Sequence, residues 1–152
     1  MDDKLTVLIL DDDRHFTEEL AEFFGNSGFR AIQANTGEDG LKKLDKENID
    51  LLILDVRLPG RSGLEILKEL AVTHPDLEVI IVSAHGDMDT VIDAMRFGAI
   101  DYLKKPFRHI DIQIAIERTE KFLRLNRKLQ QMEQKHSLIS RALEGKIERN
   151  LI

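Results

Sequence analysis

The chain has 152 residues, an apolar fraction of 42%, a formal net charge of −6 and no cysteine. This composition provides a core for one domain with an extension, and it excludes disulfides and thiolate metal sites. The longest apolar runs are only as long as a β-strand, so the sequence predicts no membrane span. The start of the chain leads directly into a predicted strand and lacks the basic start of a signal peptide, and we expect a cytoplasmic protein.

The charge is divided unevenly along the chain. Residues 1–108 carry 13 lysines and arginines against 22 aspartates and glutamates, whereas residues 109–152 carry 9 against 6. The acidic first part is a poor surface for nucleic acid, because phosphates repel it. The basic charges of the second part are distributed around an expected helix, which indicates a solvated face. We therefore expect no direct nucleic-acid binding by this segment.

Five apolar runs, separated by helical patterns, predict a β-α repeat. The runs are largely continuous rather than alternating, which is typical of parallel strands covered on both faces. They lie at about 5–10, 30–34, 50–54, 79–83 and 100–103. Because crossovers between parallel strands are right-handed, we predict an α/β fold with a doubly wound, five-stranded parallel sheet and helices on both sides.

Apolar residues at helical spacing mark four helices between these strands. The first helix has the stripe Phe16, Leu20, Phe23 and Phe24 and ends at Gly25–Gly28. Leu41 and Leu44 belong to the second helix, which has the shortest pattern. The third helix carries Leu64–Leu70 and ends before Pro75, and the fourth carries Val91–Phe97 and ends at Gly98.

From about Arg108 the sequence predicts one long helix, with no proline and no glycine before Gly145. Its apolar positions alternate steps of three and four, the a/d spacing of a coiled coil. These stripe positions are Phe122, Leu125, Leu129, Met132, His136, Ile139 and Leu143. In a parallel dimer Lys128 at g would face Glu133 at e of the partner. We predict a homodimer through this stripe; the alternative is an amphipathic helix packed on its own domain.

Polar residues stand where the predicted strands end. Asp11–Asp13 follow the first strand, Asp55 ends the third, Ser83 ends the fourth, and Lys105 follows the fifth. Parallel strands end at one edge of a sheet, which is where doubly wound proteins bind ligands. The sequence therefore predicts a polar site at this edge.

Converging carboxylates point to a cation and a phosphoryl group. Two carboxylates about 4 Å apart repel each other by roughly 4 kcal/mol at an effective dielectric of 20. A hard cation relieves this repulsion, and oxygen-only ligands favour Mg²⁺, with Mn²⁺ also suitable. One aspartate could then attack phosphorus to form an acyl phosphate. For Asp13, the role of helix N-cap is an equal alternative to a metal role.

Residues 5–120 resemble the receiver domain of bacterial two-component response regulators. The segments that carry the resemblance are Leu8–Asp13, Leu54–Gly60, Val82–Ala84 and Tyr102–Phe107. The resemblance implies a CheY-like fold with strand order 2-1-3-4-5, a receiver domain at residues 1–120, and an extended C-terminal helix at 109–150 that overlaps it.

The resemblance also implies roles for individual residues. Asp55 would be the phosphoacceptor, and Asp11 and Asp12 would bind Mg²⁺ together with Asp55 and the backbone carbonyl of Arg57. Lys105 would balance the phosphoryl charge and would precede a cis proline. Ser83 would be the switch hydroxyl, and Tyr102 the aromatic residue that moves with it.

A receiver domain implies a phosphorylation-dependent signalling switch and not an enzyme with a substrate of its own, although it assists phosphorylation and dephosphorylation of its aspartate. The expected partner is a histidine kinase or a histidine phosphotransfer protein. A narrower resemblance, carried by Val82–Asp87 and Ala94–Ala99, is to transcription regulators of the nitrogen-regulation and dicarboxylate-transport types. The alternatives are a receiver module of a hybrid kinase and a regulator with an enzymatic output domain.

Other readings fit the residues less well. A haloacid-dehalogenase-like phosphatase needs an acid two residues after its nucleophile, where this chain has Arg57. A dinucleotide-binding domain needs a glycine-rich turn after the first strand, where three acids would repel a pyrophosphate. The intact set of acids, hydroxyl and lysine argues against a degenerate receiver. His136 lacks the flanking residues of a phosphorylated kinase histidine, and a polar residue that sets coiled-coil register is the preferred interpretation.

Overall fold

The structure is a computed structural model and describes residues 4–84 and 88–150. The chain divides into two units, Met1–Ile112 and Gln113–Ile152. The first unit holds every strand among the described residues, and the second consists of most of the last helix. The segment 85–87, which contributes to the narrower family resemblance, lies outside the described residues.

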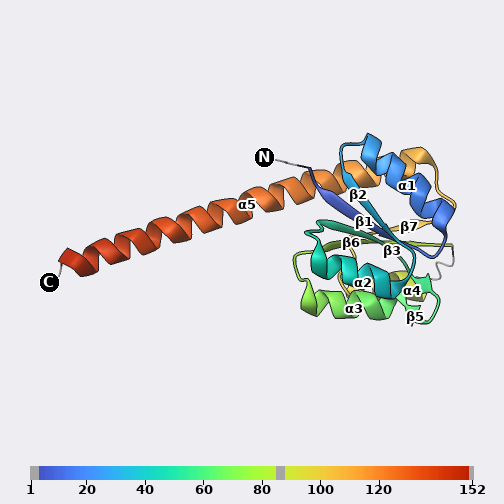
Figure 1. Cartoon of the computed structure of the whole chain (residues 1–152), viewed down its shortest axis with the longest axis horizontal. Coiled ribbons are helices and arrows are strands. Elements are labelled where there is room, and N and C mark those ends of the chain that lie inside the picture. Colours follow the sequence, from blue (N-terminus) through green and yellow to red (C-terminus); the bar gives the residue numbers. More distant parts are fainter. Residues whose placement is uncertain (1–3, 85–87, 151–152) are drawn as a thin grey trace. The chain divides into compact units, whose positions relative to one another are not determined.

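Five parallel strands form the main sheet of the first unit (Figure 1). They are β1 (Thr6–Leu10), β2 (Arg30–Ala34), β3 (Leu51–Asp55), β6 (Glu78–Ser83) and β7 (Asp101–Lys104). Their order in the sheet is β2-β1-β3-β6-β7, which confirms the predicted doubly wound topology. The inner strands β1 and β3 are wholly buried, whereas the edge strands β2 and β7 are partly exposed.

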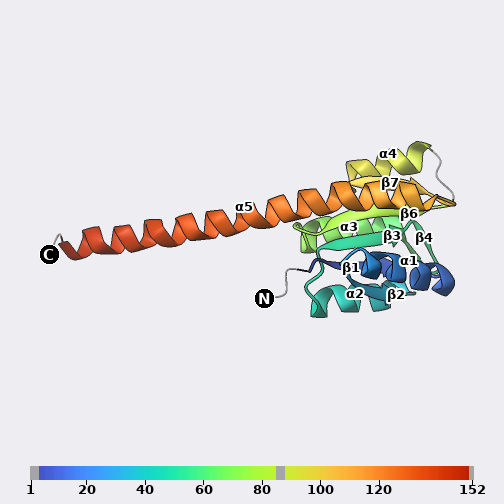
Figure 2. The same cartoon turned by 90° about the horizontal axis from the view of Figure 1, so that it is seen from above.

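Helices cover both faces of this sheet. Helix α1 (Arg14–Asn26) lies on one face, and α2 (Gly37–Lys46), α3 (Gly63–Thr73) and α4 (Met88–Arg96) lie on the other (Figures 1 and 2). Side chains cap the starts of three of them: Asp13 accepts a hydrogen bond from the backbone N–H of Phe16, Thr36 caps α2, and Ser62 caps α3. The capping role of Asp13 is thereby confirmed, which fixes the start of α1 directly after the acidic turn.

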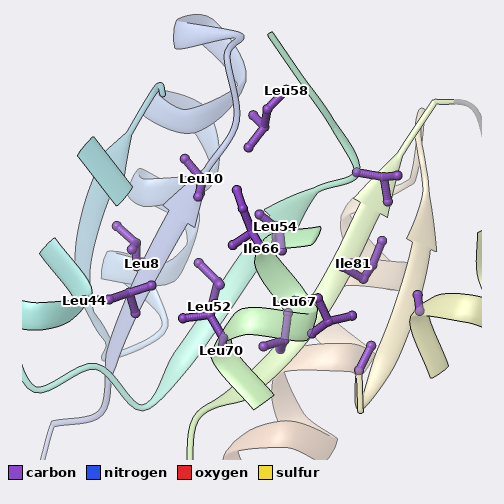
Figure 3. Close-up of a cluster of buried hydrophobic side chains, with 14 of the residues drawn as sticks. Leu8, Leu10, Leu44, Leu52, Leu54, Leu58, Ile66, Leu67, Leu70 and Ile81 are labelled. Atoms are coloured by element: carbon purple, nitrogen blue, oxygen red, sulfur yellow. The ribbon is translucent and has the colours of Figure 1, made fainter. Parts of the chain in front are cut away.

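The core on the α2–α3 side is built from leucines and isoleucines of β1, β3 and α3 (Figure 3). Leu8, Leu10, Leu52 and Leu54 project from the strands towards Ile66, Leu67 and Leu70 of α3. Every one of these side chains is at most 2% exposed. Burying a side chain of this size contributes about 1.5–3 kcal/mol, so the ends of β1 and β3 are held rigidly.

A small antiparallel hairpin, which the sequence analysis missed, follows β3. It pairs β4 (Arg57–Leu58) with β5 (Arg61–Ser62). Gly60 lies in the turn with φ of 77°, a backbone conformation that other residues rarely adopt. Strands of two residues are too short to produce a periodic pattern, although Pro59–Gly60 is a turn signal.

The last helix, α5 (His109–Asn150), is continuous and passes through Gly145 without a break. Six of the seven predicted stripe positions carry large apolar side chains that are exposed: Phe122, Leu125, Leu129, Met132, Ile139 and Leu143. None of the helices within residues 4–84 and 88–150 combines the length and apolar character that crossing a membrane requires. The Lys105–Pro106 peptide bond is cis, as the family resemblance implied.

Candidate functional site

The turn after β1 places two aspartates at the carboxyl edge of the sheet. Asp11 is buried, with 1% of its surface exposed, and its Oδ1 accepts a hydrogen bond of 2.9 Å from the backbone N–H of Asp13. Its own N–H donates to the carbonyl oxygen of Ala34 on β2. Asp12 is exposed. The turn therefore presents one carboxylate that the fold fixes and one that faces solvent.

Asp55, at the end of β3, completes an acidic cluster. One carboxylate oxygen from each of Asp11, Asp12 and Asp55 lies within 4.8 Å of the other two. The Asp55 Oδ1 accepts a hydrogen bond of 3.1 Å from the backbone N–H of Arg57, and the side chain is largely buried. These three acids, which the sequence analysis placed at one edge, are thus brought together.

Lys105 lies beside this cluster. Its ammonium group forms an ion pair with Asp11 Oδ2 and lies 3.9 Å from Asp55 Oδ2. Its backbone N–H donates to the carbonyl oxygen of Ser83, which ties the end of β6 to the lysine. Lys104, one residue earlier, is exposed. The lysine before the proline is therefore the one that reaches the acids.

Burial raises the pKa of the Asp55 carboxyl from its ordinary value of 3.8 to about 6. The nearby negative charges of Asp11 and Asp12 raise this pKa further. The hydrogen bond from the Arg57 backbone and the positive charge of Lys105 lower it, and they offset the increase only in part. Asp55 is consequently ionised at neutral pH, but at a cost that a bound cation would remove.

The remaining predicted residues lie on β6, β7 and β4, in different surroundings. Ser83 ends β6, pairs in register with Lys104 and is fully buried. Tyr102 pairs with Ile81, lies two residues before the end of β7, and packs partly buried against the core. The side chain of Arg57 is exposed, so only its backbone belongs to the site.

Three further residues shape the site and were not identified from the sequence. Asn35 donates hydrogen bonds to the carbonyl oxygen of Asp11 (2.9 Å) and to the Thr17 hydroxyl (3.0 Å), which ties the acidic turn to β2. Gly63 approaches β3 so closely that an added Cβ would lie 2.3 Å from the Asp55 carbonyl oxygen. Phe16 lies with its ring 4.0 Å from the Lys105 ammonium. A glycine at a helix start and an aromatic residue in an apolar stripe are weak sequence signals, because both have ordinary structural uses.

An apolar groove of about 760 Å³ opens next to Lys105. It runs between α1 and the segment 105–112, and its apolar lining includes Phe16, Leu20, Phe23, Pro106, Phe107 and Ile112. Phe16 and Phe23 are only half-buried, so this part of the predicted apolar stripe lines the groove and is not core.

Comparison with known proteins agrees with this geometry. The sequence profile of the response regulator receiver domain matches residues 7–117. The chain belongs to the response regulator receiver domain family. It is 35% identical over 112 residues to sporulation initiation phosphotransferase F of Bacillus subtilis, covering 74% of this chain and 90% of that protein. It is 37% identical over 110 residues to the DNA-binding transcriptional regulator NtrC of Escherichia coli, covering 72% of this chain.

Solved structures show the same fold. A response regulator receiver domain protein from Clostridium thermocellum superposes with a TM-score of 0.74 at 32% identity, covering 80% of this chain and 98% of that one. This protein is therefore a receiver domain of the kind found in two-component response regulators. It spans only 23% of NtrC, 28% of the regulator ZraR of Klebsiella oxytoca and 47% of the regulator CpxR of Klebsiella pneumoniae.

Proposed function

We propose that this receiver domain is phosphorylated on Asp55 by a histidine kinase or a histidine phosphotransfer protein, and that phosphorylation switches dimerisation or the activity of an output domain. The observation that carries the proposal is the cluster of three carboxylates within 4.8 Å, with a lysine ammonium 3.9 Å from Asp55. An acid, a cation site and a lysine arranged in this way suit transfer of a phosphoryl group to a carboxylate.

The donor set fits Mg²⁺. It consists of oxygen atoms alone, which are the ligands of a hard cation, and the charge of a bound cation would lower the raised pKa of Asp55 by favouring its ionised form. Asp11, Asp12 and Asp55, with the backbone carbonyl of Arg57, would hold the ion; Mn²⁺ could replace it. When bound, the ion would neutralise charge on the phosphoryl oxygens.

The residues of the chain account for the transfer itself. An oxygen of ionised Asp55 attacks phosphorus, and the bond from phosphorus to the donor's imidazole nitrogen breaks with its electron pair on nitrogen. The product is an acyl phosphate on Asp55. Lys105, already between Asp11 and Asp55, can move its ammonium group to the new phosphoryl oxygens.

The switch would act through Ser83 and Tyr102. Phosphorylation adds about −1.5 to −2 charges, which favours approach of a hydroxyl and an ammonium donor. Ser83 stands at the end of β6, and its carbonyl oxygen accepts a hydrogen bond from Lys105, so movement of either residue affects the other. Tyr102, on the neighbouring strand β7, would follow. This is a two-state element biased by a local charge.

A partner must bring its phosphoryl group to Asp55, and the apolar groove that includes Lys105 offers it a docking surface.

The domain boundaries we propose are 1–120 for the receiver and 109–150 for the overlapping helix, whose stripe would pair with a second copy. We further propose that the domain acts in the cytoplasm, belongs to a transcription regulator of the NtrC type, and does not itself bind nucleic acid. The similarity to NtrC and ZraR supports this output.

Incubation with phosphoramidate and Mg²⁺ tests the central proposal. Intact-protein mass spectrometry should show one acid-labile phosphate, and peptide mapping after borohydride reduction should place it on Asp55. Asp55→Asn keeps the shape of the side chain and should abolish the label, whereas Asp13→Asn, in the same acidic region, should retain it. Labelling of Asp55→Asn at the wild-type level would overturn the assignment.

A further inference from the structure

Phe16 occupies an unusual position beside the acidic site. It lies in the first turn of α1, and its backbone N–H donates a hydrogen bond of 3.1 Å to the Asp13 carboxylate. Its ring centre is 4.0 Å from the Lys105 ammonium, and Phe107 packs edge-on against the same ring at 6.0 Å and 76°. The ring is thus fixed both to the acidic turn and to the segment that follows Lys105.

The Lys105 ammonium therefore has a carboxylate on one side and an aromatic face on another. Asp11 Oδ2 is its ion-pair partner, and Asp55 Oδ2 lies 3.9 Å away. A ring face attracts a cation through its quadrupole, most strongly where water is excluded. Unlike a carbonyl oxygen, the face offers no directional acceptor, so the ammonium can slide from Asp11 towards Asp55 without losing a hydrogen bond to the ring.

We propose that Phe16 is a positioning residue, which holds the Lys105 ammonium at the acidic cluster through a cation–π interaction and lets it move to the phosphoryl group on Asp55. The inference rests on the proposed function for the identity of the reaction, but the position of Lys105 can be measured without it. Phe107 supports the arrangement by orienting the Phe16 ring.

The first measurement is an NMR signature in the metal-free protein. The ε-methylene protons of Lys105 should be shifted upfield by the ring current of Phe16. Phe16→Tyr should keep this shift and Phe16→Leu should remove it. Random-coil shifts for these protons in the wild-type protein would overturn the proposal.

The second measurement is the rate at which phosphoramidate labels Asp55 at saturating Mg²⁺. Phe16→Leu should lower this rate about 3- to 10-fold, the range that one cation–π contact supports. Phe16→Tyr should restore it. Pentafluorophenylalanine at position 16 keeps the shape of the ring and reverses its quadrupole, so it should behave like Phe16→Leu even if leucine disturbs folding.

A double-mutant cycle separates positioning from a general packing effect. In a Lys105→Met background, Phe16→Leu should have no further effect on the labelling rate, because the cation is gone. An equal loss in both backgrounds, or a wild-type rate for the pentafluorophenylalanine protein, would overturn the proposal. If the wild-type protein were not labelled on Asp55, the proposed function would fail, and the ring-current measurement would still decide the position of Lys105.

Discussion

Lys105 forms an ion pair with the buried carboxylate of Asp11, a residue 94 positions earlier in the chain. This ion pair connects the turn after the inner strand β1 with the segment that follows the edge strand β7. The same Asp11 is one of the three acids that could hold a cation. In the metal-free protein the Lys105 ammonium is therefore paired with a carboxylate that a bound Mg²⁺ would need, and we expect the two cations to compete for it.

Replacing Lys105 with alanine should strengthen Mg²⁺ binding for this reason. We expect the dissociation constant, measured by titration calorimetry, to fall about 3- to 10-fold, because a competing positive charge is removed. Lys104→Ala is the matched control, since that side chain is exposed, and it should change the constant less than about 2-fold. Unchanged or weaker binding by Lys105→Ala would show that the lysine does not compete for Asp11.

The neighbouring acids Asp12 and Asp13 should separate metal binding from helix capping. Asp12→Ala should weaken Mg²⁺ binding at least about 10-fold with little effect on stability, because its carboxylate is exposed and belongs to the acidic cluster. Asp13→Ala should cost about 1 kcal/mol of unfolding free energy through the lost cap, with little effect on Mg²⁺. Calorimetry and urea unfolding measure the two quantities, and the reverse pattern would mean that the assignment of the acids is shifted by one residue.

The raised pKa of Asp55 predicts a pH dependence of stability. Because the folded protein holds this proton more tightly than the unfolded chain, ionised Asp55 destabilises the metal-free fold progressively as the pH rises from about 4 through about 6. Asp55→Asn should therefore be more stable than the wild type by about 2–3 kcal/mol at pH 7.5, and by roughly half of that at pH 5.

Urea unfolding in chelator at both pH values checks this expectation. Saturating Mg²⁺ should reduce or reverse the difference, because it stabilises the protein with all three carboxylates more than the variant with two. Glu18→Gln, an exposed acid on α1, serves as a control and should show no such dependence. A constant difference between Asp55→Asn and the wild type from pH 5 to 7.5 would contradict the raised pKa.

Substitution by alanine should be more damaging at Gly63 than at Gly60, although both residues follow β3. A Cβ at Gly63 would lie 2.3 Å from the Asp55 carbonyl oxygen and 2.7 Å from the Val56 Cα, so the backbone at the proposed phosphorylation site would have to move. A Cβ at Gly60 meets nothing within 4 Å, and only its φ of 77° is unfavourable. Gly63→Ala should lose several-fold in labelling rate and at least about 2 kcal/mol in stability, and Gly60→Ala about 1 kcal/mol in stability alone. Equal labelling rates in the two variants would refute the argument.

The sheet could be predicted from the sequence because its signals are local. Continuous apolar runs mark β1, β3 and β6, glycines and prolines mark the helix ends, and parallel pairing brings Asp11, Asp55 and Lys105 to one edge. The family motifs added what spacing alone does not contain, such as the choice of Lys105 over Lys104.

Features that depend on packing between distant segments could not be predicted. Phe16 belongs to an apolar stripe, and periodicity does not reveal that the fold brings its ring against the Lys105 ammonium. No sequence pattern identifies Asn35 as a site residue, because its hydrogen bond to Asp11 depends on the register of β1 against β2. The pKa of Asp55 likewise reflects burial among groups from three strands.

The exposed stripe of α5 predicts self-association. Leu125 and Leu129 occupy d and a positions, and each is about half exposed in the single chain. Burying such leucines in a seam between two copies stabilises a dimer, and Lys128 would pair with Glu133 of the partner copy. Sedimentation of the wild-type protein at micromolar concentration should accordingly show a dimer.

Charged residues in the seam should then dissociate it. The double variant Leu125→Glu, Leu129→Glu would place carboxylates where water is excluded, at a cost of several kcal/mol, so we expect a monomer with a receiver that remains folded and is still labelled on Asp55. Gln130→Glu and Gln134→Glu add the same charge at b and f positions, outside the seam, and should leave the dimer intact. A wild-type monomer at high micromolar concentration would contradict pairing through the stripe. A dimer that survives both glutamates would show that the dimer interface lies elsewhere.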